Sequence, residues 1–155
     1  MHAVSETIHT LNHLIEVCKD GEYGFLASAA QATAAPLQTL LHTRASACRI
    51  AAAQLQLRVR DLGGEPGSGG SVAGAVHRGW VAVKALLATY DDVAVLAGCE
   101  RAEAAALQAY AQAKEQELPA GVRGLVEQQH EGLRRSHSLL GDLLAEMLAD
   151  RSAHA

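Results

Sequence analysis

Apolar residues recur at intervals of three and four positions along four long stretches of this chain, which is the spacing of amphipathic helices. We predict long helices over about 4–32, 36–62, 92–117 and 119–149, with a shorter helix over about 71–88. Pro36 and Pro119 stand where helices begin, and the glycine-rich run at 63–70 ends the second helix in a flexible turn. Each long helix measures about 40 Å on this prediction, so the four are matched for side-by-side packing.

The lengths of the connections predict the topology. Short links join the first helix to the second and the third to the fourth, which makes both pairs antiparallel. Residues 63–91 link the second helix to the third and are long enough to travel the length of the bundle, so these two helices run parallel. We therefore predict an all-α, ferritin-like four-helix bundle with one long crossover that contains a short extra helix, in a single domain over 1–155. A simple up-down-up-down bundle is the alternative.

Composition narrows the class of protein without pointing to an activity. Of the 155 residues, 49% are hydrophobic and only 3% aromatic, which is typical of closely packed helices rather than of sheets. The net charge of -4, with both signs interspersed, indicates neither a nucleic-acid partner nor an anionic membrane. No apolar run reaches the roughly 20 residues that span a bilayer, and the N-terminus lacks a secretory signal pattern, so we expect a cytoplasmic protein.

Four short stretches carry a resemblance to a known family: Leu-Asn-His-Leu-Ile-Glu at 11–16, Asp-Gly-Glu-Tyr-Gly-Phe at 20–25, His-Arg-Gly-Trp at 77–80 and Cys-Glu-Arg-Ala-Glu at 99–103. From about Leu11 to Leu143 the chain resembles a family of bacterial ferritin-like four-helix-bundle proteins of unknown function. The resemblance implies a ferritin-like fold and supplies no activity. Where the family pattern has Glu-Arg-Gly-Glu-Asp, this chain has Ala104 in place of the final acidic residue. A metal site here would therefore have one acidic ligand fewer.

Polar residues interrupt the apolar stripes at one level of the predicted bundle. Glu22, Arg44, Glu103 and His137 stand in the centres of their stripes, and Glu100 flanks one. Counted from the helix midpoints, all five lie within roughly one to two helical turns of one another. A carboxylate in such a place is costly to bury unless it is paired with a cation or bound to a metal.

Two interpretations of this polar layer are open. In the first, Glu22, Glu100, Glu103 and His137 bind a transition metal such as iron, manganese or zinc. In the second, no cofactor is bound and Arg44 is the counter-ion of Glu22 and of one of the other two glutamates. The second helix has no Asp or Glu between Thr33 and Arg60, so it offers a permanent cation where a diiron bundle has a carboxylate. This favours the ion pair.

No spacing of residues indicates a catalytic nucleophile with its base or a cofactor fingerprint. We therefore expect a non-catalytic, accessory or stress-related bundle, with a metal-binding ferritin-like oxidoreductase or iron-handling protein as the alternative. The alanine-rich faces around Ala29 and Ala104 suit a homo-oligomer. His77 and Trp80 either dock the short helix on the bundle or present a surface to a protein partner.

Overall fold

The computed structural model describes residues 2–67 and 74–154, and in that part of the chain all regular structure is helical. The elements are α1 (His2–Gln31), α2 (Ala35–Asp61), α3 (Ala75–Leu86), the short 3-10 helix η1 (Leu87–Thr89), α4 (Asp92–Lys114) and α5 (Ala120–Ala153). Gly74 is the N-cap residue of α3, and the short helix was predicted over about 71–88. Of the predicted segment, 71–73 lie outside the described residues.

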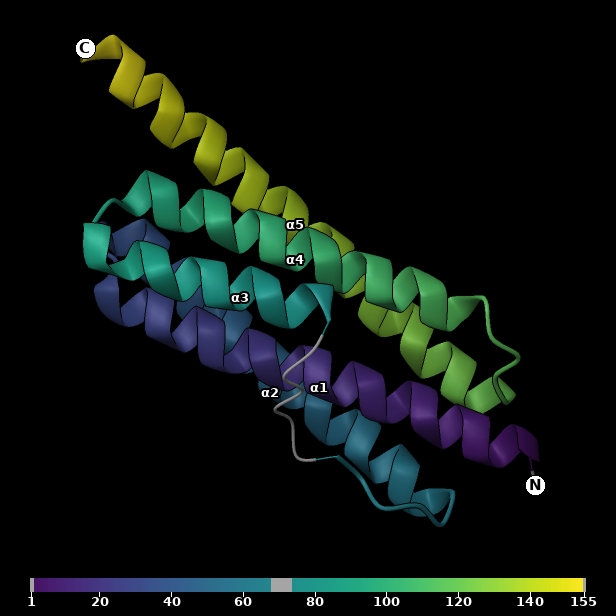
Figure 1. Ribbon diagram of the computed structural model, residues 1–155. Coiled ribbons are helices and arrows are strands. Elements are labelled where there is room, and N and C mark those ends of the chain that lie inside the picture. The colour runs from purple at the N-terminus through teal and green to yellow at the C-terminus, as the bar shows by residue number, and fades with distance from the viewer. Residues whose placement is uncertain (1, 68–73, 155) are drawn as a thin grey trace.

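The ribbon in Figure 1 shows the order of the helices in space. The helices α1 and α2 form one antiparallel hairpin, α4 and α5 form another, and α2 and α4 run in the same direction. The chain returns between α2 and α4 through α3, which runs antiparallel to both along half of the bundle. The predicted ferritin-like bundle with one crossover is therefore confirmed.

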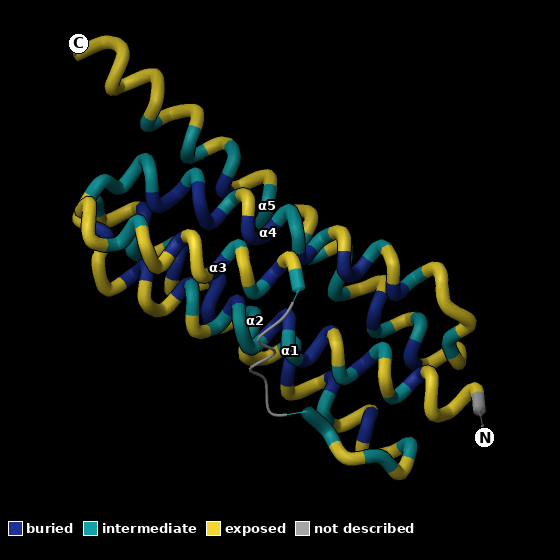
Figure 2. Tube along the Cα trace, in the orientation of Figure 1, coloured by how far each residue is buried: buried dark blue, intermediate teal, exposed yellow. Residues whose placement is uncertain are grey.

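The core is formed mainly by α1, α2 and α4, whose inner faces are buried in Figure 2. Its largest fully buried apolar side chains include Phe25, Leu11, Leu14, Ile15, Leu37, Leu41, Leu55 and Leu96. The longest helix, α5, buries only Val122, Val126 and Leu140 among its described residues. It packs on α4 and touches α2 only slightly, so the α2–α5 side of the bundle is loosely filled.

The helix α3 docks on α1 through two of the four stretches that carry the family resemblance, 77–80 and 20–25. The Trp80 ring lies directly over Gly24 of α1 and meets Phe25 edge-on, with ring centroids 4.7 Å apart and planes at 71°. His77 lies beside Asp20, with Nδ1 and Oδ2 3.7 Å apart. A glycine at position 24 allows the indole to approach the α1 backbone, which explains why these motifs occur together.

Helix α4 also holds the turn between α1 and α2. The carboxylate of Asp92 accepts hydrogen bonds from the backbone nitrogens of Thr33 and Ala34, at 3.0 and 2.8 Å, and from the Thr33 hydroxyl at 2.8 Å. The neighbouring Asp91 caps α4 by accepting from the nitrogens of Val93 and Ala94. These bonds satisfy backbone groups that a helix start leaves open.

We predict that Gly24→Ala destabilises the bundle by about 2 to 3 kcal/mol, because a methyl group at position 24 overlaps the Trp80 ring. Urea unfolding followed by circular dichroism measures the change. Gly124→Ala is the matched control, since nothing lies within 4 Å of a Cβ there. The control is expected to leave stability unchanged or raise it by up to about 1 kcal/mol. Equal effects of the two substitutions would contradict this account of α3 docking.

Candidate functional site

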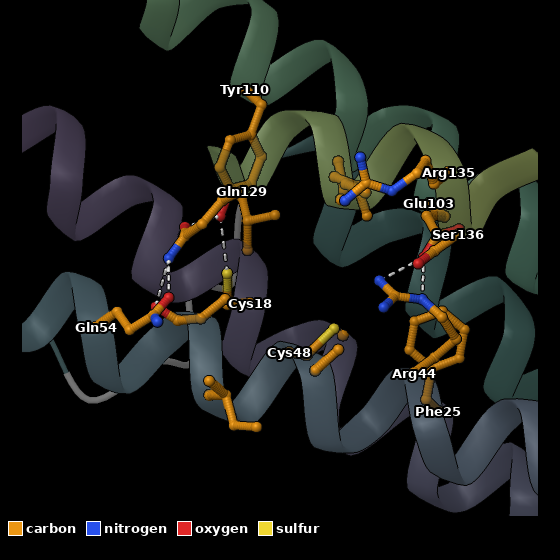
Figure 3. Close-up of a pocket in the computed structure, with 18 of the residues that line it drawn as sticks. Cys18, Phe25, Arg44, Cys48, Gln54, Glu103, Tyr110, Gln129, Arg135 and Ser136 are labelled. Carbon is orange, nitrogen blue, oxygen red and sulfur yellow. Dashed lines mark hydrogen bonds and ion pairs between the residues drawn. The ribbon is translucent and has the colours of Figure 1, made fainter. Parts of the chain in front are cut away.

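A buried ion pair joins α2 to α4 in the interior of the bundle. The Nε of Arg44 donates a hydrogen bond to Oε2 of Glu103 over 2.9 Å, and Nη2 lies 2.9 Å from the same oxygen. The two side chains are 7% and 1% exposed. The Arg44 guanidinium also stacks over the Phe25 ring, 5.5 Å from its centroid, and Figure 3 shows the three side chains together. The ring and the carboxylate together hold the cation in place.

Two opposing effects act on the pKa of Glu103. Burial raises the pKa of its carboxyl group above the ordinary 4.5, while the charge of Arg44, its hydrogen bond and His137 lower that pKa. The second oxygen, Oε1, is buried without a hydrogen-bond partner among the described residues, and so is Nε2 of His137. His137 Nε2 also lies 3.9 Å from Oε1 of Glu100, which is beyond hydrogen-bond distance.

The polar layer is smaller than the sequence predicts. Glu22 forms its ion pair with Lys19 of the same helix, at 3.4 Å, and not with Arg44 as expected. Helix midpoints give the level of a residue along the bundle but not the direction in which its side chain points. A lysine one turn away on α1 offers Glu22 a partner near solvent, whereas Arg44 is already engaged by Glu103.

Next to the ion pair lies a cavity of about 590 Å³ that sequence reasoning missed. All four long helices and Trp80 line it, mostly with apolar and small residues. These residues include Val17, Gly21, Phe25, Ala47, Ile50, Ala51, Ala106, Gly132, Leu133 and Leu139. Arg44 and Glu103 form one end of the group drawn in Figure 3, and Cys18, Tyr110, Gln129 and Gln54 form the other. In the sequence, the feature that corresponds to this cavity is the presence of glycine and alanine at inward-facing positions of all four long helices.

The side chains at the second end of the cavity bond to one another. The Tyr110 hydroxyl donates to Oε1 of Gln129 at 2.7 Å and lies 3.3 Å from Sγ of Cys18. The Gln129 amide donates to Oε1 of Gln54 and to the backbone oxygen of Ala51. This network ties α5 to α4 and α2 where apolar packing between the helices is thin.

The three cysteines are buried or partly buried thiols. Burial raises the pKa of Cys18 to about 11 and that of Cys99 to about 12, and it also raises the pKa of Cys48. A thiol with such a pKa is protonated at neutral pH, so it is neither a good nucleophile nor a ready metal ligand.

Comparison with known proteins assigns the chain to a family. Residues 6–116 match the family described as Domain of unknown function (DUF2383). The chain belongs to the DUF2383 family. No curated protein matches this DUF2383 chain. Among solved structures it is similar to the dodecameric thioferritin described as the bacterioferritin-related protein from Bacteroides fragilis. The TM-score is 0.76 at 17% identity, over 97% of this chain and 90% of that one.

The fold class raises the question of a metal site, and the residues of this DUF2383 protein do not fit one. A ferritin-like dinuclear centre takes carboxylates from all four helices, whereas here Glu22 lies with Lys19 and Arg44 holds an oxygen of Glu103. Within 2–67 and 74–154, no three His, Cys, Asp or Glu side chains are grouped to hold a metal ion. Two unpartnered atoms, Glu103 Oε1 and His137 Nε2, are fewer donors than a protein metal site normally supplies.

The structure places the two residues of the predicted partner surface differently, with Trp80 buried and His77 partly exposed. Trp80 is 7% exposed and is packed on Gly24 and Phe25, so it is part of the core. His77 remains partly exposed beside Asp20. These two residues dock α3, which was the other interpretation of their spacing.

None of the helices in the described chain is both long and apolar enough to cross a bilayer.

We predict that Arg44→Met destabilises the fold by about 3 kcal/mol, because it leaves the buried Glu103 carboxylate without its cation. The double variant Arg44→Met/Glu103→Leu removes both charges and is expected to recover most of that loss. Urea unfolding of the four proteins in the cycle measures the coupling between the two positions. If the double variant is as unstable as the sum of the single variants, the two side chains do not form a pair.

The same cycle has a predicted pH dependence. The folded-state pKa of Glu103 is raised, so the folded protein binds more protons and stability falls as pH rises from 4.5 toward the folded value. Removing Arg44 takes away the charge that lowers this pKa, so the folded-state pKa rises further and stability falls over a wider pH range. The cost of Arg44→Met is therefore expected to be larger at about pH 8 than at about pH 5. The double variant lacks the titrating group and serves as control, and a cost that is equal at both pH values would contradict the assignment.

Proposed function

We propose that this protein is a non-catalytic helical bundle with an accessory role, in which the Arg44–Glu103 ion pair takes the place of a metal centre. The observation that carries the proposal is the contact of Nε and Nη2 of Arg44 with one oxygen of Glu103, both at 2.9 Å. A permanent cation bound to a candidate ligand disfavours a dication at the same carboxylate.

The chemistry of the other buried groups supports the same proposal. The thiols of Cys18, Cys48 and Cys99 are held protonated by burial, which does not suit nucleophilic catalysis. The Tyr110 hydroxyl has a pKa raised by burial and is engaged with Gln129. None of these four groups has the lowered pKa of an activated nucleophile.

The alternative is a metal-binding, ferritin-like oxidoreductase or iron-handling protein. One observation favours it: Oε1 of Glu103 and Nε2 of His137 are buried and lack hydrogen-bond partners among the described residues. Buried polar atoms in that state call for a water molecule or an ion. The donor set would be Glu103, His137 and Glu100, without Glu22.

Iron binding separates the two functions. We expect protein purified without an affinity tag to oxidise ferrous iron in air no faster than buffer, and to retain less than about one iron per ten chains after dialysis, because Arg44 competes for Glu103. Absorbance spectroscopy and metal analysis measure these quantities. Glu103→Gln is the matched variant, since it keeps the side-chain shape and removes the charge. Stoichiometric iron that is lost in Glu103→Gln would establish the metal-binding alternative.

Self-association is a further part of the proposal. The similar structure from Bacteroides fragilis is described as dodecameric, and we extend only homo-oligomerisation to this chain. Of the alanine-rich faces that suit an interface, the one around Ala29 is centred on a residue only 3% exposed, whereas Ala104 on the other is partly exposed. Leu57 on α2, Val81 on α3 and Leu148 on α5 are large apolar side chains at the surface and are better suited to contact another copy.

A further inference from the structure

The cavity beside the ion pair replaces packed side chains in the middle of the bundle. The residues that face it from the helices include Gly21, Ala47, Ala51, Ala106 and Gly132, where a packed bundle has leucine or isoleucine. Its volume of about 590 Å³ is within the range of pockets that hold small molecules. The cavity is open to solvent at the side where Ile50 and Leu139 are 51% and 55% exposed, so an occupant would cover apolar surface that is now in contact with water.

One wall of the cavity carries unused hydrogen-bond donors. A guanidinium has five N–H groups, and Arg44 directs two of them at Oε2 of Glu103. Of the residues that the structure describes, Glu103 alone forms a hydrogen bond or ion pair with Arg44. Figure 3 shows one edge of the guanidinium toward Glu103 and the other toward Cys48 and the space beside it. An acceptor oxygen placed there would meet N–H groups on a side chain that is only 7% exposed.

Charge decides which kind of acceptor fits. The carboxylate of Glu103 already balances Arg44, so a second carboxylate at the same guanidinium would meet repulsion from the first. At the rim, Arg135 shares Glu131 with Arg134, and the Nη1 atoms of these two arginines lie 3.8 and 3.5 Å from its two oxygens. At the opposite end, the Tyr110 hydroxyl donates to the side-chain oxygen of Gln129, and the Gln129 amide donates to Gln54 and to the backbone oxygen of Ala51. The site therefore suits a neutral acceptor at Arg44 and an apolar body elsewhere.

We propose that this cavity binds a neutral, largely apolar small molecule whose carbonyl oxygen accepts hydrogen bonds from Arg44. The apolar body lies between α2 and α5 against side chains such as Ile50, Leu133 and Leu139. The cavity is open between α2 and α5, where the lining residues Ile50 and Leu139 are exposed, so the molecule can enter from that side. The proposal adds a ligand to the non-catalytic bundle, and its test does not depend on whether the protein binds iron.

The dye prodan is a suitable probe, since it is a neutral naphthalene with a single ketone and its emission responds to polarity. We expect saturable binding of one prodan per chain to the full-length protein, with blue-shifted emission. Gly132→Phe should weaken binding about tenfold, because position 132 lines the cavity and a Cβ there meets only the end of Arg135 at 4.0 Å. Gly124→Phe is the control on the same helix outside the cavity and should retain affinity within about twofold.

Competition tests the chemical class of the ligand. We expect 2-nonanone to displace prodan at a concentration at least about fivefold lower than nonanoate does. The variant Arg44→Met/Glu103→Leu keeps the cavity without the N–H groups, and its prodan affinity should fall about tenfold. Should that variant fail to fold, the Gly132→Phe and Gly124→Phe pair and the competition still decide the question.

Several results would overturn the proposal. Absence of saturable prodan binding, or equal binding by Gly132→Phe and Gly124→Phe, would remove the cavity as the site. Stronger displacement by nonanoate would replace the neutral carbonyl with an anion. If prodan fails to bind and sedimentation shows that Gly132→Phe dissociates an oligomer, the occupant is a second copy of the chain.

Discussion

A carboxylate buried between helices has to be neutralised, and in this bundle the neutralising charge comes from Arg44. The pair that it forms with Glu103 links α2 to α4, two parallel helices that have little direct backbone contact with each other. Phe25 of α1 supports the guanidinium from one side, so three helices depend on one charged contact. The same contact engages Oε2 of Glu103 and leaves Oε1 without a hydrogen-bond partner among the described residues.

Helix α3 connects the crossover to the core of the bundle. It lies on α1 and α4, where Trp80 covers Gly24 and Gly79 comes close to Ala102, with a built Cβ only 3.2 Å from the Ala102 Cα. The indole contacts Phe25, and Phe25 contacts Arg44, so the crossover is connected to the ion pair through two rings. On the other side of the bundle, α5 has few contacts with α2, and the cavity lies between them.

Particular residues show how far sequence reasoning reached. Pro36, Pro119 and the glycine-rich run predicted where helices begin and end, since these are local properties of the backbone. Arg44 and Glu103 were predicted to face the interior because each stands in the centre of an apolar stripe, and both are buried. The partner of Glu22 was predicted wrongly, because Lys19 on the same helix was not considered. The cavity was missed because small inward-facing residues were interpreted as close packing.

The sequence by itself determined the presence and order of the helices and the single crossover, because helical periodicity and connection length act over neighbouring residues. It also predicted that Arg44 and Glu103 face the interior, and it left an ion pair and a metal site as two interpretations. Only the tertiary structure decided that Glu103 is the partner of Arg44, and that α5 leaves room beside α2. Each helix can rotate about its axis without changing its pattern, and only contacts between residues far apart in the sequence select one rotation.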